Sequence, residues 1–418
     1  MGKTGIISIL NMGYTKSAIK GVSWMSGLRM TNRALTFVKI AVLARLLTPA
    51  EFGIFGIATL LLSFLQILTE TGLNVVLIQS QKQIEEYLDS AWILSILRGA
   101  FIFLIILLSA PFVASFFNTP ASLNIILLIG LSPLIKGFIN PAEVRFQKNL
   151  TFNYEFLFRT TLYFTDAAVA IIAALITHSV YSLAFGLLAG SILEVILSFT
   201  VVKPLPKLKF NNNYLKEIFH KGKWVTAYGI FNYFSENGDN IVVGKVLGAT
   251  TLGLYQMAYK VSYIPISEIS DVANIVIFPV FSKIDQDKKR LISAFWKSTG
   301  VISFLTIIAG GIIFLFPKEV ITVILGQQWV SAAPVLRVLS IYGIIRAAMG
   351  PSSAMFLALE KQRYVTFMIF VRFITLIITI YPLVIYFGMV GAGYSALLSS
   401  LTEFPIILYF IYKISKGR

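Results

Sequence analysis

The stretch that decides the fold is Ile40–Ala58, IAVLARLLTPAEFGIFGIA, which has a counterpart 200 residues later in Asn240–Ala258, NIVVGKVLGATTLGLYQMA. At this offset Gly53 aligns with Gly253, and most of the flanking positions are apolar in both copies. A segment that returns at a fixed offset indicates an internal repeat. The chain is therefore predicted to contain two copies of one unit.

A second match supports the repeat. With an offset of 210, Ile135–Phe146 (IKGFINPAEVRF) aligns with Ile345–Phe356 (IRAAMGPSSAMF), so that Pro141 meets Pro351. The ten additional residues fit a larger external loop around Phe316–Trp329. Two matches in the same order predict a duplicated unit of six helices.

The composition is that of a membrane protein. The chain has 418 residues, of which 57% are hydrophobic and 13% are charged. Soluble domains carry about 25% charged residues, so a water-soluble globule is excluded. The chain has no cysteine, which excludes a disulfide scaffold. These numbers predict a polytopic membrane protein.

The apolar stretches are too long for strands of a membrane barrel, which have about 10 residues and alternate in hydropathy. Because backbone groups in lipid must pair within their own segment, stretches of this length are predicted to be helices. The fold class is therefore all-α, with about twelve transmembrane helices, near residues 18–45, 53–78, 91–116, 122–145, 160–178, 181–202, 224–248, 253–282, 293–316, 331–358, 364–387 and 389–412.

The net charge of +16 comes mostly from lysine and arginine in alternate loops. Cytoplasmic loops are the basic ones, so both termini are predicted to be cytoplasmic, and Lys318 is nearly alone outside. The basic segment 203–223 is predicted to be a cytoplasmic linker between lobes at 1–202 and 224–418. Because six spans return the chain to the side from which it started, the two six-helix lobes are predicted to enter the membrane in the same direction. Two such lobes around a central cleft suit alternating access.

Several local signals have structural explanations. Thr48-Pro49-Ala50-Glu51 is a capping box that starts a helix, and Asn140-Pro141 repeats this chemistry. The pairs Gly186/Gly190 and Gly244/Gly248 predict close approach between helices.

Cations inside the spans point to an anionic ligand, because each is costly unless it faces a wet cavity or a partner. Arg29, Arg33 and Lys39 fall within about a third of the circumference of the first helix. Arginine suits phosphate because its planar fork binds two oxygens. Other cations extend toward the membrane surface: Arg45, Lys245, Lys297 and Arg372. The remaining candidates for binding an anionic head group are Arg98, Lys136 and Arg346.

Acids inside the spans have two explanations that the sequence leaves open. Glu236 and Asp239 lie three residues apart on the seventh helix. They either form a cation or proton site or neutralise the arginines of the first helix. The candidates for ion coupling are Glu236, Asp239, Asp166 and Asp271.

No enzyme site emerges from the sequence. The two histidines, His178 and His220, lie far apart, and no nucleotide-binding glycine motif occurs. We therefore expect no enzyme activity, no cofactor and no metal. Basic loops at the inner surface explain the positive charge without a nucleic acid.

The segments Ala44–Gly53 and Asp239–Gly248 resemble those of bacterial flippases for polysaccharide repeat units, within the multidrug/oligosaccharidyl-lipid/polysaccharide exporter superfamily. The resemblance implies an inner-membrane transporter that moves undecaprenyl-pyrophosphate-linked oligosaccharide units for O-antigen, capsule or exopolysaccharide. It implies that Arg29, Arg33 and Lys39 hold the pyrophosphate. It also implies as partners the lipid-linked substrate, membrane lipids, the polymerase machinery and a coupling cation, H⁺ or Na⁺.

The sequence fits two other functions less well. A multidrug or organic-cation antiporter of the same superfamily would need an acidic, aromatic-lined cavity, against which the cations of the first helix argue. A glycan polymerase would need a large external loop, and the longest predicted external loop, near Phe316–Trp329, is too short.

Overall fold

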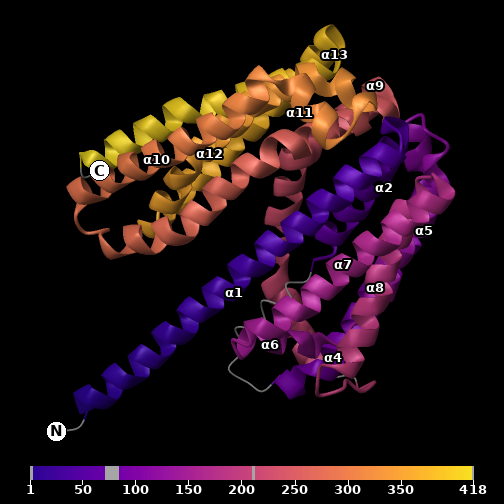
Figure 1. Cartoon of the computed structure of the whole chain (residues 1–418). Helices are drawn as coiled ribbons and strands as arrows, with labels where there is room; N and C mark the ends of the chain where they lie inside the picture. The colour runs from indigo at the N-terminus through magenta and orange to yellow at the C-terminus, as the bar shows by residue number, and fades with distance from the viewer. Residues whose placement is uncertain (1–2, 71–83, 210–211, 417–418) are drawn as a thin grey trace. The chain divides into compact units, whose positions relative to one another are not determined.

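Helices form almost all of the described chain, as the computed structural model shows (Figure 1). The structure describes residues 3–70, 84–209 and 212–416, and no strand occurs within these ranges. The all-α prediction is confirmed. The long helices are α1 (Lys3–Leu46), α2 (Pro49–Leu68), α4 (Ile84–Phe116), α5 (Ser122–Lys136), α7 (Phe152–Thr177), α8 (Tyr181–Thr200), α9 (Asn212–Lys283), α10 (Lys288–Leu315), α12 (Ala333–Ala358) and α13 (Gln362–Ser415).

Short helices connect some of these. The first half contains η1 (Pro141–Val144) and α6 (Arg145–Lys148), and the second half contains α11 (Pro317–Ile324) and η2 (Gln327–Ala332). The larger external loop predicted around Phe316–Trp329 is thus mostly helical.

The chain separates into two units, each with its own set of internal contacts. Unit 1 comprises residues 1–47, 58–114 and 120–230, and unit 2 comprises 48–57, 115–119 and 231–418. Two short segments of the first half thus pack with the second. The predicted linker 203–223 is helical from Asn212 onward, because α9 begins there.

Eight helices in the described ranges are long and apolar enough to cross a membrane, or nine if the bent α5–α6 pair is one span. Two of the eight, α9 and α13, are merged pairs that bend at Gly248 and Gly388. The charged α1 is not among these helices. If the bent pair is counted as one span, dividing the two merged helices and adding α1 gives the twelve predicted segments.

The α9 and α13 pairs are antiparallel hairpins. In α9, Tyr255 Oη donates to Asp239 Oδ2 at 2.7 Å across the turn at Gly248. In α13, Thr375 Oγ1 lies 3.2 Å from Thr402 Oγ1 on the opposite arm. Each chain reversal is made around a single glycine, with φ of 84° at Gly248 and 59° at Gly388. Glycine adopts positive φ without a steric penalty.

The capping box starts α2 as predicted. The Thr48 backbone N–H donates to Glu51 Oε2 at 2.8 Å, and the Glu51 N–H donates to Thr48 Oγ1 at 3.4 Å. The following turn packs within unit 2 against the repeat-related part of α9. A methyl group on Gly53 would lie 1.7 Å from Ala249 O, and one on Gly253 would lie 2.0 Å from Pro49 O. The two aligned segments of the repeat therefore touch reciprocally, backbone to backbone.

The other predicted glycine pairs behave differently from each other. A methyl group on Gly186 of α8 would lie 2.5 Å from Asp166 O of α7, so this glycine permits the close α7–α8 packing that was predicted. Gly244 lies against the ring of Phe117, at 2.9 Å from such a methyl group. The prediction for Gly248 was wrong, since nothing lies within 4 Å and the residue forms the turn of α9 instead.

In unit 1, the chain bends by 74° between α5 and the η1–α6 segment. Asn140 fixes this bend from a fully buried position. Its Oδ1 accepts from the Ala142 N–H at 3.0 Å, and its Nδ2 donates to Ser198 O and Pro204 O. Asn140 thus caps η1 and ties the bend to the end of α8.

Candidate functional site

The basic stripe on α1 differs in exposure along its length. Arg29 and Arg33 lie one helical turn apart, and both are exposed. Lys39 is half-buried, and its Nζ lies 2.7 Å from Oδ1 and 2.8 Å from Oδ2 of Asp166 on α7. Lys39 was predicted to bind an anion and Asp166 to couple an ion, but the two groups bind each other within unit 1.

Arg98 of α4 uses its donors at the end of α2. Its Nη2 lies 3.1 Å from Glu70 Oε2 and donates to Gln66 O at 2.6 Å, while its Nε donates to Thr69 Oγ1 at 3.1 Å. The guanidinium therefore ties α4 to the end of α2.

A network of charges joins α5, α7 and α8 in unit 1. Glu194 of α8 is 5% exposed and receives Lys136 Nζ at 3.0 Å. Arg159 of α7 pairs with the other oxygen of Glu194. The second Nη of Arg159 lies 3.1 Å from Glu143 Oε1, next to the bend of the chain. Two cations from two helices thus hold one buried carboxylate.

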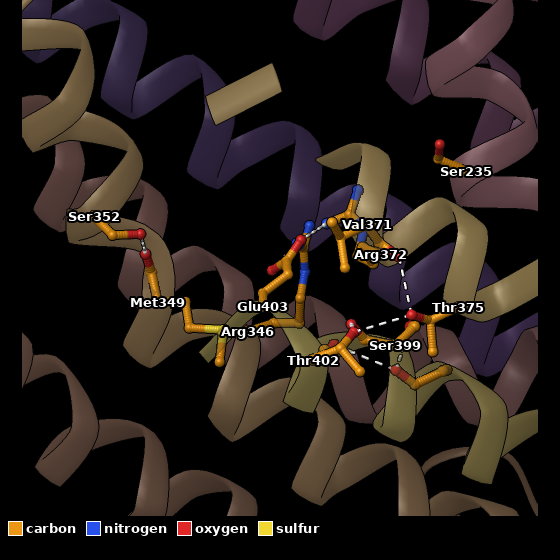
Figure 2. Close-up of polar contacts among 12 residues, drawn as sticks. Ser235, Arg346, Met349, Ser352, Val371, Arg372, Thr375, Ser399, Thr402 and Glu403 are labelled. Carbon is orange, nitrogen blue, oxygen red and sulfur yellow. Dashed lines mark hydrogen bonds and ion pairs between the residues drawn. The ribbon is translucent and has the colours of Figure 1, made fainter. Parts of the chain in front are cut away.

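Unit 2 contains a related triad, in which Figure 2 shows Glu403 between Arg346 and Arg372. Arg346 Nη1 of α12 lies 3.7 Å from Glu403 Oε2, and Arg372 Nη1 lies 3.6 Å from Glu403 Oε1. Arg372 is only 7% exposed, so the prediction that it extends to the membrane surface was wrong. Glu403 supplies an opposite charge, which lowers the cost of burying Arg372.

The two triads occupy matching places in the repeat. Arg346 follows Lys136 by 210 residues, and Glu403 follows Glu194 by 209. The relation between the two carboxylates lies outside the aligned segments Ile135–Phe146 and Ile345–Phe356, so the predicted repeat did not include it. The unit 2 triad is looser, because both of its ion pairs exceed hydrogen-bond length. Arg346 Nε is also buried without a hydrogen-bond partner in the described part of the chain.

Asp239 is the buried acid of the α9 hairpin. It is 5% exposed, and it accepts hydrogen bonds from Tyr255 Oη at 2.7 Å and from the Asn240 N–H at 2.7 Å. No ion pair to Asp239 is found among the described side chains. Glu236, one turn away, is exposed. The side chain of Asp271 lies outside the described residues.

Tyrosine rings from α9 and α12 gather in the same unit. Tyr259 lies 5.0 Å from Tyr263 and 6.1 Å from Tyr342 between ring centroids. Tyr255 is completely buried beside Asp239. Unit 2 thus combines buried acids, arginines and phenol groups. Within the described ranges, no group of three His, Cys, Asp or Glu side chains could hold a metal ion.

Several proteins of known name are similar to the chain. A membrane protein in the cps region of Klebsiella pneumoniae is 28% identical, over 96% of this chain and 84% of that protein. The teichuronic acid biosynthesis protein TuaB of Bacillus subtilis is 28% identical, over 82% and 72%. The lipopolysaccharide biosynthesis protein WzxC of Escherichia coli is 24% identical, over 83% and 71%.

Solved structures support the fold. The lipid II flippase MurJ, in its inward closed conformation, has a TM-score of 0.75 at 15% identity, covering 93% of this chain and 87% of that one. An inward-facing multidrug resistance transporter of the MATE family has a TM-score of 0.71 at 14% identity, covering 95% and 99%. The family described as polysaccharide biosynthesis protein matches residues 42–334. The chain is a multi-pass helical membrane protein that belongs to this polysaccharide biosynthesis family.

Proposed function

We propose that the chain is a flippase that moves an undecaprenyl-pyrophosphate-linked oligosaccharide from the cytoplasmic to the periplasmic leaflet of a bacterial inner membrane. Membership of the polysaccharide biosynthesis family supports this function. The names of relatives support it too, since they include a succinoglycan biosynthesis transport protein and a probable low-salt glycan biosynthesis flippase. The substrate is a unit of surface polysaccharide, and polymerase machinery receives it outside.

The observation that carries the proposal is the exposed pair Arg29 and Arg33 on α1. Arg29 and Arg33 are one turn apart and exposed, so two guanidinium groups on one helix face can meet neighbouring phosphates. The pyrophosphate binds at this exposed pair.

The test is glycan export in cells that carry Arg29→Ala and Arg33→Ala together. Export should fall at least tenfold, because two bidentate contacts are lost. Lysine at both positions keeps the charge but lacks the planar guanidinium group that binds two oxygens. This variant should therefore give intermediate export. Met30→Ala, an exposed change between them, is the control for expression and should export normally. Full export by the double alanine variant would remove the phosphate role from this pair.

For ion coupling, Asp239 is the favoured carboxylate of the four proposed. It is buried and hydrogen-bonded, and it has no ion pair among the described side chains. Asp166, in contrast, is neutralised by Lys39. Asp239→Asn should abolish substrate-dependent proton or sodium flux in proteoliposomes, whereas the exposed Glu236→Gln should retain it. Unchanged flux in Asp239→Asn would show that Asp239 is not the coupling group.

The multidrug antiporter is the second candidate, and one observation favours it. Asp239 and the tyrosines at 255, 259, 263 and 342 supply an acid and aromatic rings in one unit, which suits an organic cation. Overexpression that raises drug resistance, together with normal glycan in a deletion strain, would replace the flippase with this function.

A further inference from the structure

A groove opens on unit 2 where α10 and the second arm of α13 flank α12. Its volume is about 290 Å³, which lies at the lower end of the range for ligand sites. Phe295 and Trp296 of α10, Ala348 of α12 and Phe404 of α13 are among the residues that line it. Trp296 and Phe404 are each about half exposed. The lining is almost entirely apolar, so the groove suits a hydrocarbon chain.

The three helices place the groove at one depth. At a rise of 1.5 Å per residue, its lining begins about 10 Å from Lys288 on α10 and ends about 20 Å from it. The same interval separates the lining residues of α12 from Ala358, and those of α13 from Ser415. One leaflet contributes about 15 Å of the hydrocarbon core. The head-group layer adds about 5–7 Å on each side. With the helix ends in that layer, the groove lies within a single leaflet.

These helix ends are strongly basic. Lys288, Lys289 and Arg290 are consecutive and exposed at the start of α10. At the adjoining ends of the α12–α13 connection and of α13, Lys361 Nζ and Lys413 Nζ lie 5.2 and 5.9 Å from the centre of the Tyr364 ring. A buried cluster that includes Leu291 and Ile414 holds the two ends together. The groove thus lies about 10 Å below a basic rim on the same three helices.

We propose that this groove binds one acyl chain of an anionic phospholipid, whose phosphate lies on the basic rim. Charge complementarity selects the anionic head group, since positive residues near a membrane surface attract acidic lipids. The length selects the phospholipid, because its acyl chain spans one leaflet whereas a polyprenyl tail is far longer than the groove. The leaflet is the cytoplasmic one in the orientation that the loop charges predict, with both termini in the cytoplasm. This lipid site does not depend on which substrate the protein transports.

Trp296 provides the probe. The full chain and its Trp296→Phe variant are placed in phosphatidylcholine vesicles that contain increasing fractions of brominated phosphatidylglycerol or brominated phosphatidylcholine. The difference between the two proteins gives the fluorescence of Trp296 alone. Bromine quenches on contact, so the fraction of brominated lipid needed for half quenching measures the affinity of the groove for that lipid. We expect this fraction to be at least threefold lower for the anionic lipid.

Two controls separate the groove from ordinary lipid contact. Val301→Trp, in the Trp296→Phe background, puts an indole on the same helix at a position that is 61% exposed and outside the groove. It should show no preference. Replacing Lys288, Lys289 and Arg290 by glutamine should remove the preference at Trp296 while neutral lipid still quenches. This variant alters only exposed residues, so it leaves the helix packing intact.

Three results would overturn the proposal. The first is equal quenching of Trp296 by both lipids, which would mean ordinary boundary lipid. The second is a preference that the glutamine variant retains. The third is stronger competition by polyprenyl phosphate. If it displaces the brominated lipid at a lower fraction of the vesicle lipid than unbrominated phosphatidylglycerol does, the groove binds a substrate tail. None of these measurements uses transport, so they stand apart from the test of Arg29 and Arg33.

Discussion

Charged side chains in the described spans are held mostly in pairs between helices. Lys39 and Asp166 are linked by two hydrogen-bonded contacts, and the triads of Glu194 and Glu403 each join three helices. A charge in lipid is costly, and a partner reduces that cost. Removing one member leaves the other unpaired, so these pairs stabilise the helix contacts that they span.

The Lys39–Asp166 pair gives a residue-scale prediction. Asp166→Asn should destabilise the protein by about 1–3 kcal/mol, because it leaves Lys39 without its counterion. Lys39→Gln combined with Asp166→Asn should recover part of this loss. The measurement is the midpoint of thermal unfolding in detergent, with exposed Arg29→Gln as the neutral control. Strictly additive losses in the double variant would show that the two groups are not coupled.

The sequence indicated which charges lie in the membrane but not which of them pair. Lys39 and Asp166 are 127 positions apart, and nothing local relates them. Hydropathy gives the cost of placing each charge in the membrane, but it contains no information about a partner on another helix. The repeat gave one hint of pairing. The offset that aligns Lys136 with Arg346 nearly aligns Glu194 with Glu403 as well, so both copies carry a cation and an acid at related positions.

Glycine controls the contacts of the elements in three distinct ways. Gly53 and Gly253 let two backbones touch, Gly248 and Gly388 reverse the chain at positive φ, and Gly300 of α10 has open space around it. The residue type is the same, but the space that a Cβ atom would enter differs. The effect of an alanine substitution on stability should therefore differ in sign between these classes of glycine.

Alanine at two of these glycines tests the distinction at the scale of the element. Gly53→Ala should lower the unfolding midpoint, because its methyl group would lie 1.7 Å from Ala249 O and the helices would have to separate. Gly300→Ala should stabilise the protein by about 0.5–1 kcal/mol, because alanine has the higher helix propensity, and should therefore raise the midpoint. Equal effects at both positions would contradict the close approach at Gly53.

Two breaks between helices were readable from sequence, but several helix ends were not. The helix predicted from 18 begins at Lys3, and the one predicted from 224 begins at Asn212. Hydropathy placed breaks at 248–253 and 387–389, close to Gly248 and Gly388. What it missed is that no loop follows, since α9 and α13 turn on one glycine each. The backbone angles that allow this depend on packing between the arms, such as the contact between Asp239 and Tyr255, which is not a local property of the sequence.

At the scale of the whole molecule, the proposed topology puts both termini in the cytoplasm, and the natural absence of cysteine makes it directly testable. A cysteine at exposed Lys318 should react with an impermeant maleimide in intact spheroplasts. Cysteines at exposed Lys288 and Lys416 should react only after the membrane is opened. Reaction of Lys288→Cys in intact spheroplasts would reverse the orientation. It would also move the proposed lipid site to the outer leaflet.

The hairpins of α9 and α13 have a mechanical consequence. Because the chain reverses around one residue, neither hairpin contains slack that could stretch before its helices are disturbed. A force that pulls the chain from one end must first break contacts between the arms, such as Thr375 with Thr402. In force spectroscopy the two arms of each hairpin should therefore leave the membrane together, in a single rupture event and not in two.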